Sequence, residues 1–126
     1  MEYTKLGNSD LTVSRICMGC MGFGDPRTGQ HSWTIGEERS REVLRQALEL
    51  GINFFDTAIG YQNGTSEAYL GRALRDFAKR EDVVVATKFP GRSPEEIAAG
   101  VTGQQHVENF LDKSLHHLGM DYVDLY

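Results

Sequence analysis

The sequence is poor in several features that mark whole classes of protein. Its 126 residues include two cysteines, three prolines and one tryptophan. So few cysteines argue against a disulfide-stabilised scaffold and favour a reducing compartment, so we expect a cytoplasmic protein. No apolar stretch approaches the length of a membrane span, and the N-terminus lacks the charged and then apolar pattern of a secretory leader. We therefore expect no membrane partner.

Basic residues are scarce as well. Thirteen Lys and Arg stand against 18 Asp and Glu, for a formal net charge of -5, and the basic residues are scattered along the chain. This pattern is not that of a nucleic-acid-binding protein, so no nucleic-acid partner is expected. The chain is 40% hydrophobic and 25% charged, which is typical of a globular protein. We expect a single domain over residues 1–126, because no linker, repeat or low-complexity segment interrupts it.

Short apolar runs alternate with helical patterns along the chain. A turn signal at residues 7–10, between residues 3–6 and 11–13, predicts an N-terminal β-hairpin. Four further strands are expected at residues 15–18, 52–55, 83–87 and 122–126. Three helices are expected at residues 34–50, 66–79 and 102–118. The sequences Thr34-Ile35-Gly36-Glu37 and Thr102-Gly103-Gln104-Gln105 have the spacing of capping boxes at helix starts.

The order hairpin, β, α, β, α, β, α, β predicts an α/β fold. Strands that alternate with helices of this length indicate a parallel sheet with right-handed crossovers. The run "VVVAT" at residues 83–87 is almost entirely β-branched and apolar, as expected of a parallel strand that is buried on both faces. In such folds the functional residues gather at the carboxyl ends of the strands.

Three residues stand out at these strand ends. Asp56 ends the second strand in "FFDTAIGY", Tyr61 lies in the loop that follows, and Lys88 ends the third strand in "VVVATK". Each alone has an ordinary structural explanation: a turn cap, a packed surface ring, a solvated amine. Together they deliver a carboxylate, a phenol and an ammonium to one edge of the sheet, which the ordinary explanations do not account for. We therefore take Asp56, Tyr61 and Lys88 as the candidate catalytic residues.

A carboxylate, an ammonium and a phenol in contact have a consistent chemistry. A free phenol, with a pKa of about 10, is a poor proton donor or acceptor at neutral pH. A neighbouring ammonium favours the phenolate and lowers that pKa, while a carboxylate keeps the ammonium charged and oriented. Such a set suits delivery of a proton to a carbonyl oxygen as that oxygen gains negative charge. It supplies no hydride, so a reduction requires a cofactor.

These segments resemble the aldo-keto reductase family, in the branch that includes potassium-channel β subunits. The likeness is carried by "LGNSDLTVSRICMG", "FFDTAIGYQNGTSEAYLGRAL", "ATK" and "LGMDYVDLY", in the family's order and spacing. It implies a (β/α)8 fold of the TIM-barrel type, of which this chain is the N-terminal half, with the hairpin covering the barrel floor. It also implies NADPH as the hydride donor and small-molecule aldehydes or ketones as substrates.

The resemblance assigns roles residue by residue. It implies that Tyr61 is the general acid, that Lys88 tunes it, and that Asp56 is the partner of the lysine. It also implies that the turn Gly19-Cys20-Met21, together with Asp56, lies beside the nicotinamide and its ribose. The family's fourth catalytic member, a histidine at the end of strand four, is expected a few residues beyond Tyr126.

Other motifs carry weaker hypotheses. Cys17-Met18-Gly19-Cys20 is a CxxC motif, but it ends a strand and has no second ligand pair, so no metal or redox site is expected. The glycine-rich residues 19–24 lack the GxGxxG spacing, and a polar loop separates them from the next helix. All four histidines are expected to be non-catalytic, with His31 and Trp33 as candidates for the substrate entrance.

Two functional alternatives stay open at this point. A reductase-like barrel can serve as a non-catalytic binding subunit, as in the channel-associated relatives. Half a barrel can also persist by self-association into a homo-oligomer without activity, because its unpaired strand edges and apolar face otherwise meet water. We expect a polypeptide of these 126 residues alone to be inactive.

Overall fold

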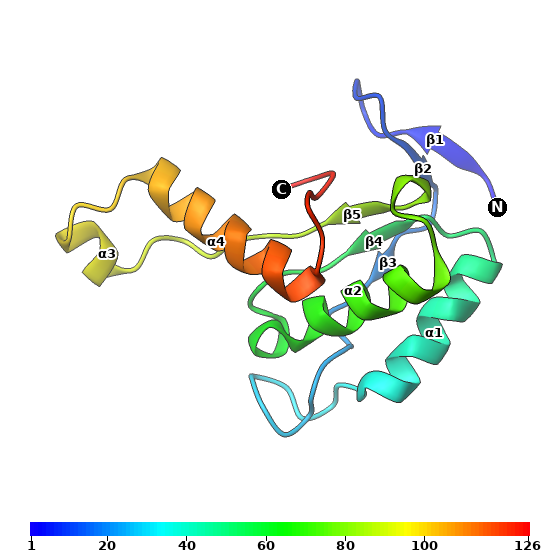
Figure 1. Cartoon of the computed structure of the whole chain (residues 1–126), viewed down its shortest axis with the longest axis horizontal. Coiled ribbons are helices and arrows are strands. Elements are labelled where there is room, and N and C mark those ends of the chain that lie inside the picture. Colours follow the sequence, from blue (N-terminus) through cyan, green and yellow to red (C-terminus); the bar gives the residue numbers. More distant parts are fainter.

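A computed structural model describes all 126 residues (Figure 1). The chain begins with an antiparallel hairpin of β1 (Tyr3–Lys5) and β2 (Thr12–Ser14), which confirms the predicted hairpin. Gly7 takes a φ of +58° in the connecting turn, a left-handed conformation that glycine adopts without steric cost. The hydroxyl of Tyr3 donates to the carbonyl of Gly51 at 2.7 Å and so fixes the hairpin to the rest of the molecule.

The next three strands form a parallel sheet in the order β3-β4-β5. They are short: β3 is Met18–Gly19, β4 is Phe54–Asp56 and β5 is Val84–Ala86. Helix α1 (Glu37–Glu49) connects β3 to β4, and helix α2 (Thr65–Phe77) connects β4 to β5. The two helices lie next to each other along one side of the sheet (Figure 1). The predicted alternation of parallel strands and helices is confirmed.

The core lies between the sheet and these two helices. Apolar residues three or four apart on each helix form the face that packs on the strands. Residues from both helices and from the strands are nearly inaccessible to solvent: Leu44, Ala47, Phe55, Leu70, Ala73, Leu74 and Val85. Removal of this apolar surface from water supplies the main driving force for folding. The carboxyl ends of the strands, just beyond this core, are thereby held in fixed positions.

Helix α4 (Gly103–Leu118) packs against α2 through a glycine. A Cβ at Gly71 would collide with the carbonyl of Leu118, so glycine is required for this close approach. The predicted capping box at the start of α4 is confirmed. The Thr102 hydroxyl accepts from the Gln105 amide at 3.1 Å, and the Gln105 side chain accepts from the Thr102 amide at 2.9 Å.

The predicted start of the first helix is wrong. Helix α1 begins at Glu37, with Gly36 as its N-cap and no hydrogen bond from a side-chain cap. The hydroxyl of Thr34 instead donates to the carbonyl of His31 at 3.4 Å and accepts from the Gln62 side chain at 3.2 Å. Because this hydroxyl is engaged within the preceding loop, the Thr34–Glu37 spacing does not produce a capping box.

Other element boundaries shift by a few residues. The strand expected at residues 15–18 is confined to β3, and the second helix ends at Phe77, two residues early. A short 3-10 turn, η2 (Arg80–Asp82), follows it. Helix α3 (Pro94–Ala98) is not among the predicted elements, because five residues are too few to show a helical apolar pattern.

The fourth strand is the largest departure from the prediction. Residues 122–126 form a single parallel bridge, between Ala86 and Leu125. The carboxylate of Asp124 accepts a hydrogen bond from the Val85 amide at 2.9 Å, so a side chain takes the place of a ladder bond at this edge. No further strand of the chain lies beyond this edge to extend the sheet.

Candidate active site

The carboxyl ends of two adjacent parallel strands carry the candidate residues. Asp56 is the last residue of β4 and is paired with Ala86 of β5, so Lys88 follows two residues beyond that pair. Tyr61 begins a 3-10 turn, η1 (Tyr61–Gly64), which leads directly into α2. A short connection between β4 and α2 therefore returns the phenol to the edge of the sheet from which the carboxylate projects.

The Lys88 ammonium lies at the centre of the site. It donates to the Asp56 carboxylate at 2.8 Å, to the Thr57 carbonyl at 2.7 Å and to the Tyr61 hydroxyl at 3.5 Å. These three contacts match the three donors of an ammonium group. The structure thus brings Asp56, Tyr61 and Lys88 together, as the sequence pattern predicts.

The charge of Lys88 is stabilised by its neighbours. Partial burial alone would lower the pKa of this ammonium, but the hydrogen bond and negative charge of Asp56, together with Tyr61, outweigh burial and raise the pKa above its ordinary value. Lys88 therefore carries its proton at neutral pH. It acts as a fixed positive charge beside the phenol oxygen and not as a base.

A hollow of about 280 Å³ opens next to these groups. It is lined by Gln30, Ala58, Gly60, Tyr61, Lys88, Phe89 and Pro90. The phenol and the ammonium share it with apolar side chains on one side and one amide, that of Gln30, from the loop before α1. A small organic molecule placed here would meet a proton donor, a positive charge and an apolar wall.

The expected cofactor turn lies beside Asp56. Gly19 is paired with Asp56 in the sheet, and the Cys20 amide donates to the Asp56 carbonyl at 2.8 Å. A Cβ placed at Gly19 would meet nothing within 4 Å, so the space over this residue is open. Met21 is 40% exposed, whereas the Cys20 side chain is buried in the core. The open surface over Gly19 and the exposed Met21 fit a flat ring packed on the turn, with Cys20 contributing its main chain only.

One buried group close to the site is absent from the sequence prediction. The Glu67 carboxylate is fully buried; it accepts from the Thr87 hydroxyl at 2.6 Å and is hydrogen-bonded to Nδ1 of His117 at 2.8 Å. Thr87 immediately precedes Lys88, so this group supports the strand end that carries the lysine. The signal was present in the sequence: Glu67 lies three residues before Leu70 and therefore falls on the apolar face of α2.

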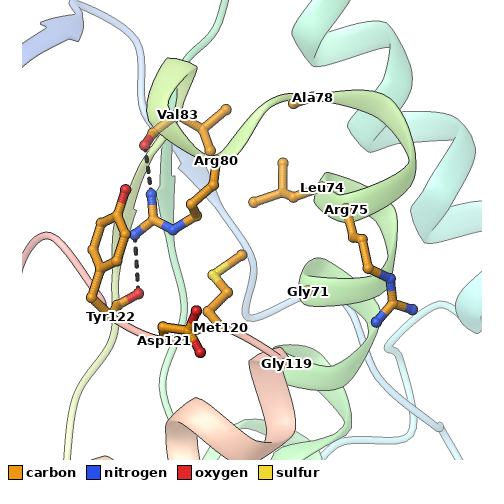
Figure 2. Close-up of a pocket in the computed structure, with 10 residues that line it drawn as sticks. All are labelled: Gly71, Leu74, Arg75, Ala78, Arg80, Val83, Gly119, Met120, Asp121 and Tyr122. Atoms are coloured by element: carbon orange, nitrogen blue, oxygen red, sulfur yellow. Dashed lines mark hydrogen bonds between the residues drawn. The ribbon is translucent and has the colours of Figure 1, made fainter.

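A second hollow, of about 250 Å³, lies at the opposite ends of the strands (Figure 2). Its lining comes from α2, from the segment between α2 and β5, and from the segment after α4. Figure 2 shows the Arg80 guanidinium donating to the carbonyls of Val83 and Tyr122 beside this hollow. Arg80 also pairs with Asp124 at 2.6 Å and stacks on the Tyr122 ring. These contacts hold the last segment of the chain in place, and the hollow contains none of the candidate catalytic groups.

The other residues that the sequence analysis considered are the two cysteines, His31 and Trp33. Cys17 is exposed, Cys20 is buried, and both thiols are free. No group of three or more His, Cys, Asp and Glu side chains lies close enough to hold a metal ion.

His31 stacks on Trp33, whose side chain is largely exposed, and their neighbour Gln30 is the loop residue that lines the 280 Å³ hollow. None of the helices is both long and apolar enough to cross a bilayer.

The fold and the site together define a class of protein: a parallel α/β chain that collects a carboxylate, an ammonium and a phenol at its strand ends. Residues 15–126 match the sequence profile of the Aldo/keto reductase family, and the chain belongs to this family. Aldo-keto reductases are oxidoreductases that act on small carbonyl compounds. The family resemblance and the α/β barrel-type fold predicted from the sequence are confirmed.

Individual relatives agree with this assignment. The chain is 33% identical to versiconal hemiacetal acetate reductase of Aspergillus parasiticus, over 99% of this chain and 41% of that protein. It is 36% identical to a probable voltage-gated potassium channel subunit beta of Oryza sativa subsp. japonica, over 99% of this chain and 36% of that protein. An aldo-keto reductase of Bacillus halodurans, solved in its holo form, superposes with a TM-score of 0.77 at 33% identity, over 100% of this chain and 39% of that one.

The chain spans about two fifths of the length of these relatives. Its hairpin, its three parallel strands and the helices on their outer side correspond to the N-terminal half of the aldo-keto reductase (β/α)8 barrel.

Proposed function

We propose that these residues provide the proton-donating machinery of an NADPH-dependent reductase of aldehydes or ketones. The observation that carries the proposal is the place of the Lys88 ammonium, 2.8 Å from the Asp56 carboxylate and 3.5 Å from the Tyr61 hydroxyl. A charged lysine in this position stabilises negative charge that develops on the phenol oxygen during proton transfer. Membership of the aldo/keto reductase family supports the same reaction class.

Each side chain has a distinct role in this proposal. Tyr61 lines the 280 Å³ hollow, and its hydroxyl donates a hydrogen bond to the oxygen of the substrate carbonyl. As that oxygen gains negative charge, Tyr61 transfers its proton to it, and the Lys88 ammonium stabilises the phenolate that remains. Asp56 keeps Lys88 charged and fixed in place. The product is the corresponding alcohol.

The three side chains supply a proton but no hydride. NADPH, when bound, supplies the hydride to the carbonyl carbon. Gly19, the main chain of Cys20, and Met21 would hold its nicotinamide end next to Asp56, because the space over Gly19 is open and Met21 is exposed.

One observation favours a second function. The relative from Oryza sativa is a probable potassium channel subunit, and its 36% identity is similar to the 33% identity of versiconal hemiacetal acetate reductase. A reductase-like barrel that binds a partner protein is therefore the alternative to a free enzyme. The free enzyme and the binding subunit differ in their turnover of carbonyl compounds, because a binding subunit does not require catalysis.

The test is a measurement of carbonyl-dependent oxidation of NADPH and, separately, of NADH. It uses the full-length product of the gene and a panel of aliphatic and aromatic aldehydes and ketones. We expect turnover with NADPH for some members of the panel and weaker turnover with NADH. Tight NADPH binding without turnover of any carbonyl compound would contradict the enzymatic proposal and favour the binding subunit.

A further inference from the structure

Two residues with strained backbones follow Tyr61 directly. Gln62 has φ +47° and ψ +48°, and Asn63 has φ +53° and ψ +39°. These are the only residues other than glycine with positive φ in the chain. Left-handed backbone is unfavourable for residues with a Cβ and persists where surrounding contacts enforce it. The contacts that enforce it here are made by the Gln62 side chain.

The Gln62 side chain is 1% exposed and is surrounded by the main chain of one loop. Its Oε1 accepts from the His31 amide at 2.8 Å. Its Nε2 lies within hydrogen-bonding distance of the Asp25 carbonyl at 2.9 Å, the His31 carbonyl at 2.7 Å, the Thr34 hydroxyl at 3.2 Å and the Thr28 carbonyl. The two protons of the amide are thus shared among four acceptors, all in residues 25–34.

Residues 25–34, which we call the wall loop, have little structure of their own. Their one main-chain hydrogen bond within the loop runs from the Thr28 amide to the Asp25 carbonyl. The ends are closed by a bridge between Phe23 and Ile35. The loop has the closed form of an Ω-loop, but its centre is filled by a side chain from elsewhere in the sequence.

Two glycines show how closely the wall loop fits around this side chain. A Cβ at Gly24 would lie 2.5 Å from the Cβ of Gln62, and one at Gly29 would lie 2.7 Å from its Cα. Both glycines have positive φ. The main chain before and within the loop therefore lies directly against Gln62, and a shift of Gln62 must displace the loop.

The wall loop also reaches the candidate active site. Gln30 lines the 280 Å³ hollow together with Tyr61 and Lys88. We propose that Gln62 holds the wall loop as one side of the carbonyl pocket, and that Gln62 thereby determines which carbonyl compounds reach the Tyr61 hydroxyl. The inference rests on the proposed reductase function. Gln62 is a positioning residue, because it acts through the loop and through its neighbour Tyr61.

The hollow that Gln30 of the wall loop lines is small. Its volume of about 280 Å³ lies just below the usual range of small-molecule sites, about 300–1,000 Å³. With the loop held, bulky carbonyl compounds are excluded by the Gln30 side of the pocket. When the Gln62 hydrogen bonds are lost, Gln30 can move away from Tyr61, and the preference for small aldehydes over bulky ones decreases.

A pair of variants separates the effect of the Gln62 hydrogen bonds to the wall loop, which we call the clamp, from the effect of backbone strain. Gln62→Gly removes the amide and also relieves the left-handed backbone. Asn63→Gly relieves the same kind of strain at the adjacent, exposed residue but leaves the clamp intact. Any difference between the two variants is therefore due to the Gln62 side chain.

Two measurements on the full-length protein are compared. The first is the ratio of kcat/KM for propionaldehyde to that for a bulky aromatic aldehyde. The second is the rate of tryptic cleavage after Arg27, which is exposed and is the only Lys or Arg of the wall loop. Gln62→Gly is expected to lower the selectivity ratio by about tenfold, the scale of discrimination by pocket size. It is also expected to speed cleavage after Arg27 at least several-fold, whereas Asn63→Gly changes neither.

Equal behaviour of the two variants in either measurement would overturn the inference. If Gln62→Gly does not fold, Gln30→Ala removes the contact of the loop with the pocket and must itself lower the selectivity ratio; an unchanged ratio overturns the inference. If the unmodified protein reduces no carbonyl compound, the proposed function fails and the selectivity claim fails with it. Whether Gln62 holds the wall loop is then decided by the rate of cleavage after Arg27 alone.

Discussion

The ammonium of Lys88 donates to the carboxylate of Asp56 at 2.8 Å, across the adjacent carboxyl ends of β4 and β5. Asp56 is the last residue of β4, and Lys88 lies two residues beyond the end of the adjacent strand β5. The Tyr61 hydroxyl lies 3.5 Å from the same nitrogen. Because the pair sits on strand ends and not on a flexible loop, its geometry is set by the core beneath it.

Replacement of Lys88 by Met should remove the positive charge and keep the length of the side chain. We expect kcat to fall by about 10²–10³-fold, since one electrostatic partner of the transition state is lost. NADPH affinity should change little. The matched control is Lys79→Met, an exposed lysine without an ion pair. Steady-state kinetics and a fluorescence titration of the cofactor measure both effects, and near-parental turnover in Lys88→Met would contradict the role of the lysine.

The buried Glu67 should matter for stability. Loss of one partner from a buried, hydrogen-bonded pair leaves His117 and the Thr87 hydroxyl without their acceptor. We expect Glu67→Ala to lower the free energy of unfolding by about 3–5 kcal/mol. Chemical denaturation of the full-length protein measures this, with the exposed Glu81→Ala as the control. Equal losses of unfolding free energy in the two variants would show that the buried Glu67 carboxylate stabilises the fold no more than an exposed one.

His106 should give the protein a pH-dependent stability. Its Nε2 is 2.7 Å from the Pro90 carbonyl and its Nδ1 is 3.0 Å from the Glu96 carboxylate, so both ring nitrogens face acceptors. The Pro90 carbonyl and then Glu96 raise the pKa of His106 above its ordinary value. A raised folded-state pKa means that protonation favours the folded state. The stabilisation is complete below the unfolded pKa of about 6.5 and is lost as pH rises through the folded pKa.

The measurement compares the unfolding free energies of the parental protein and His106→Gln. The difference should be larger at about pH 5.5 than at about pH 9. A difference that is constant with pH, or larger at the alkaline end, would show that His106 is not held in its charged form.

Much of the site could be predicted from the sequence, because its residues are close to regular elements. Apolar runs that end in Asp56 and Lys88 indicate strand ends, and parallel strands place such ends together. Tyr61 could be placed with them because only four residues, 57–60, separate it from the strand end at Asp56. These predictions depended on patterns within a few residues of each group.

The parts that could not be predicted depend on contacts between distant residues. Glu67 meets His117 across 50 positions, and Gln62 meets Thr34 across 28. The latter contact also explains the wrong helix start, because capping-box spacing describes only a local hydrogen bond. The shortened fourth strand has a similar origin: the Asp124 carboxylate, which pairs with Arg80 across 44 positions, takes the place of one ladder bond at the sheet edge.

A polypeptide limited to residues 1–126 should lack useful activity. A (β/α)8 barrel needs about 250 residues, and several large apolar residues are exposed in this part of it: Ile16, Phe89, Tyr122 and Leu125. Apolar surface of this extent beside unpaired strand edges drives association. We expect the polypeptide to sediment as an oligomer and to bind NADPH weakly. A monomer that binds NADPH with micromolar affinity would contradict this expectation.

The central claim is that Tyr61 gives its proton to the substrate carbonyl, and Tyr61→Phe in the full-length protein tests it most directly. The change removes one hydroxyl and leaves the ring in place beside Lys88. We predict that kcat for aldehyde reduction falls by about 10²–10⁴-fold, the usual contribution of a positioned general acid, while the Kd for NADPH measured by fluorescence stays near the parental value. A Tyr61→Phe protein that keeps near-parental turnover would contradict the account.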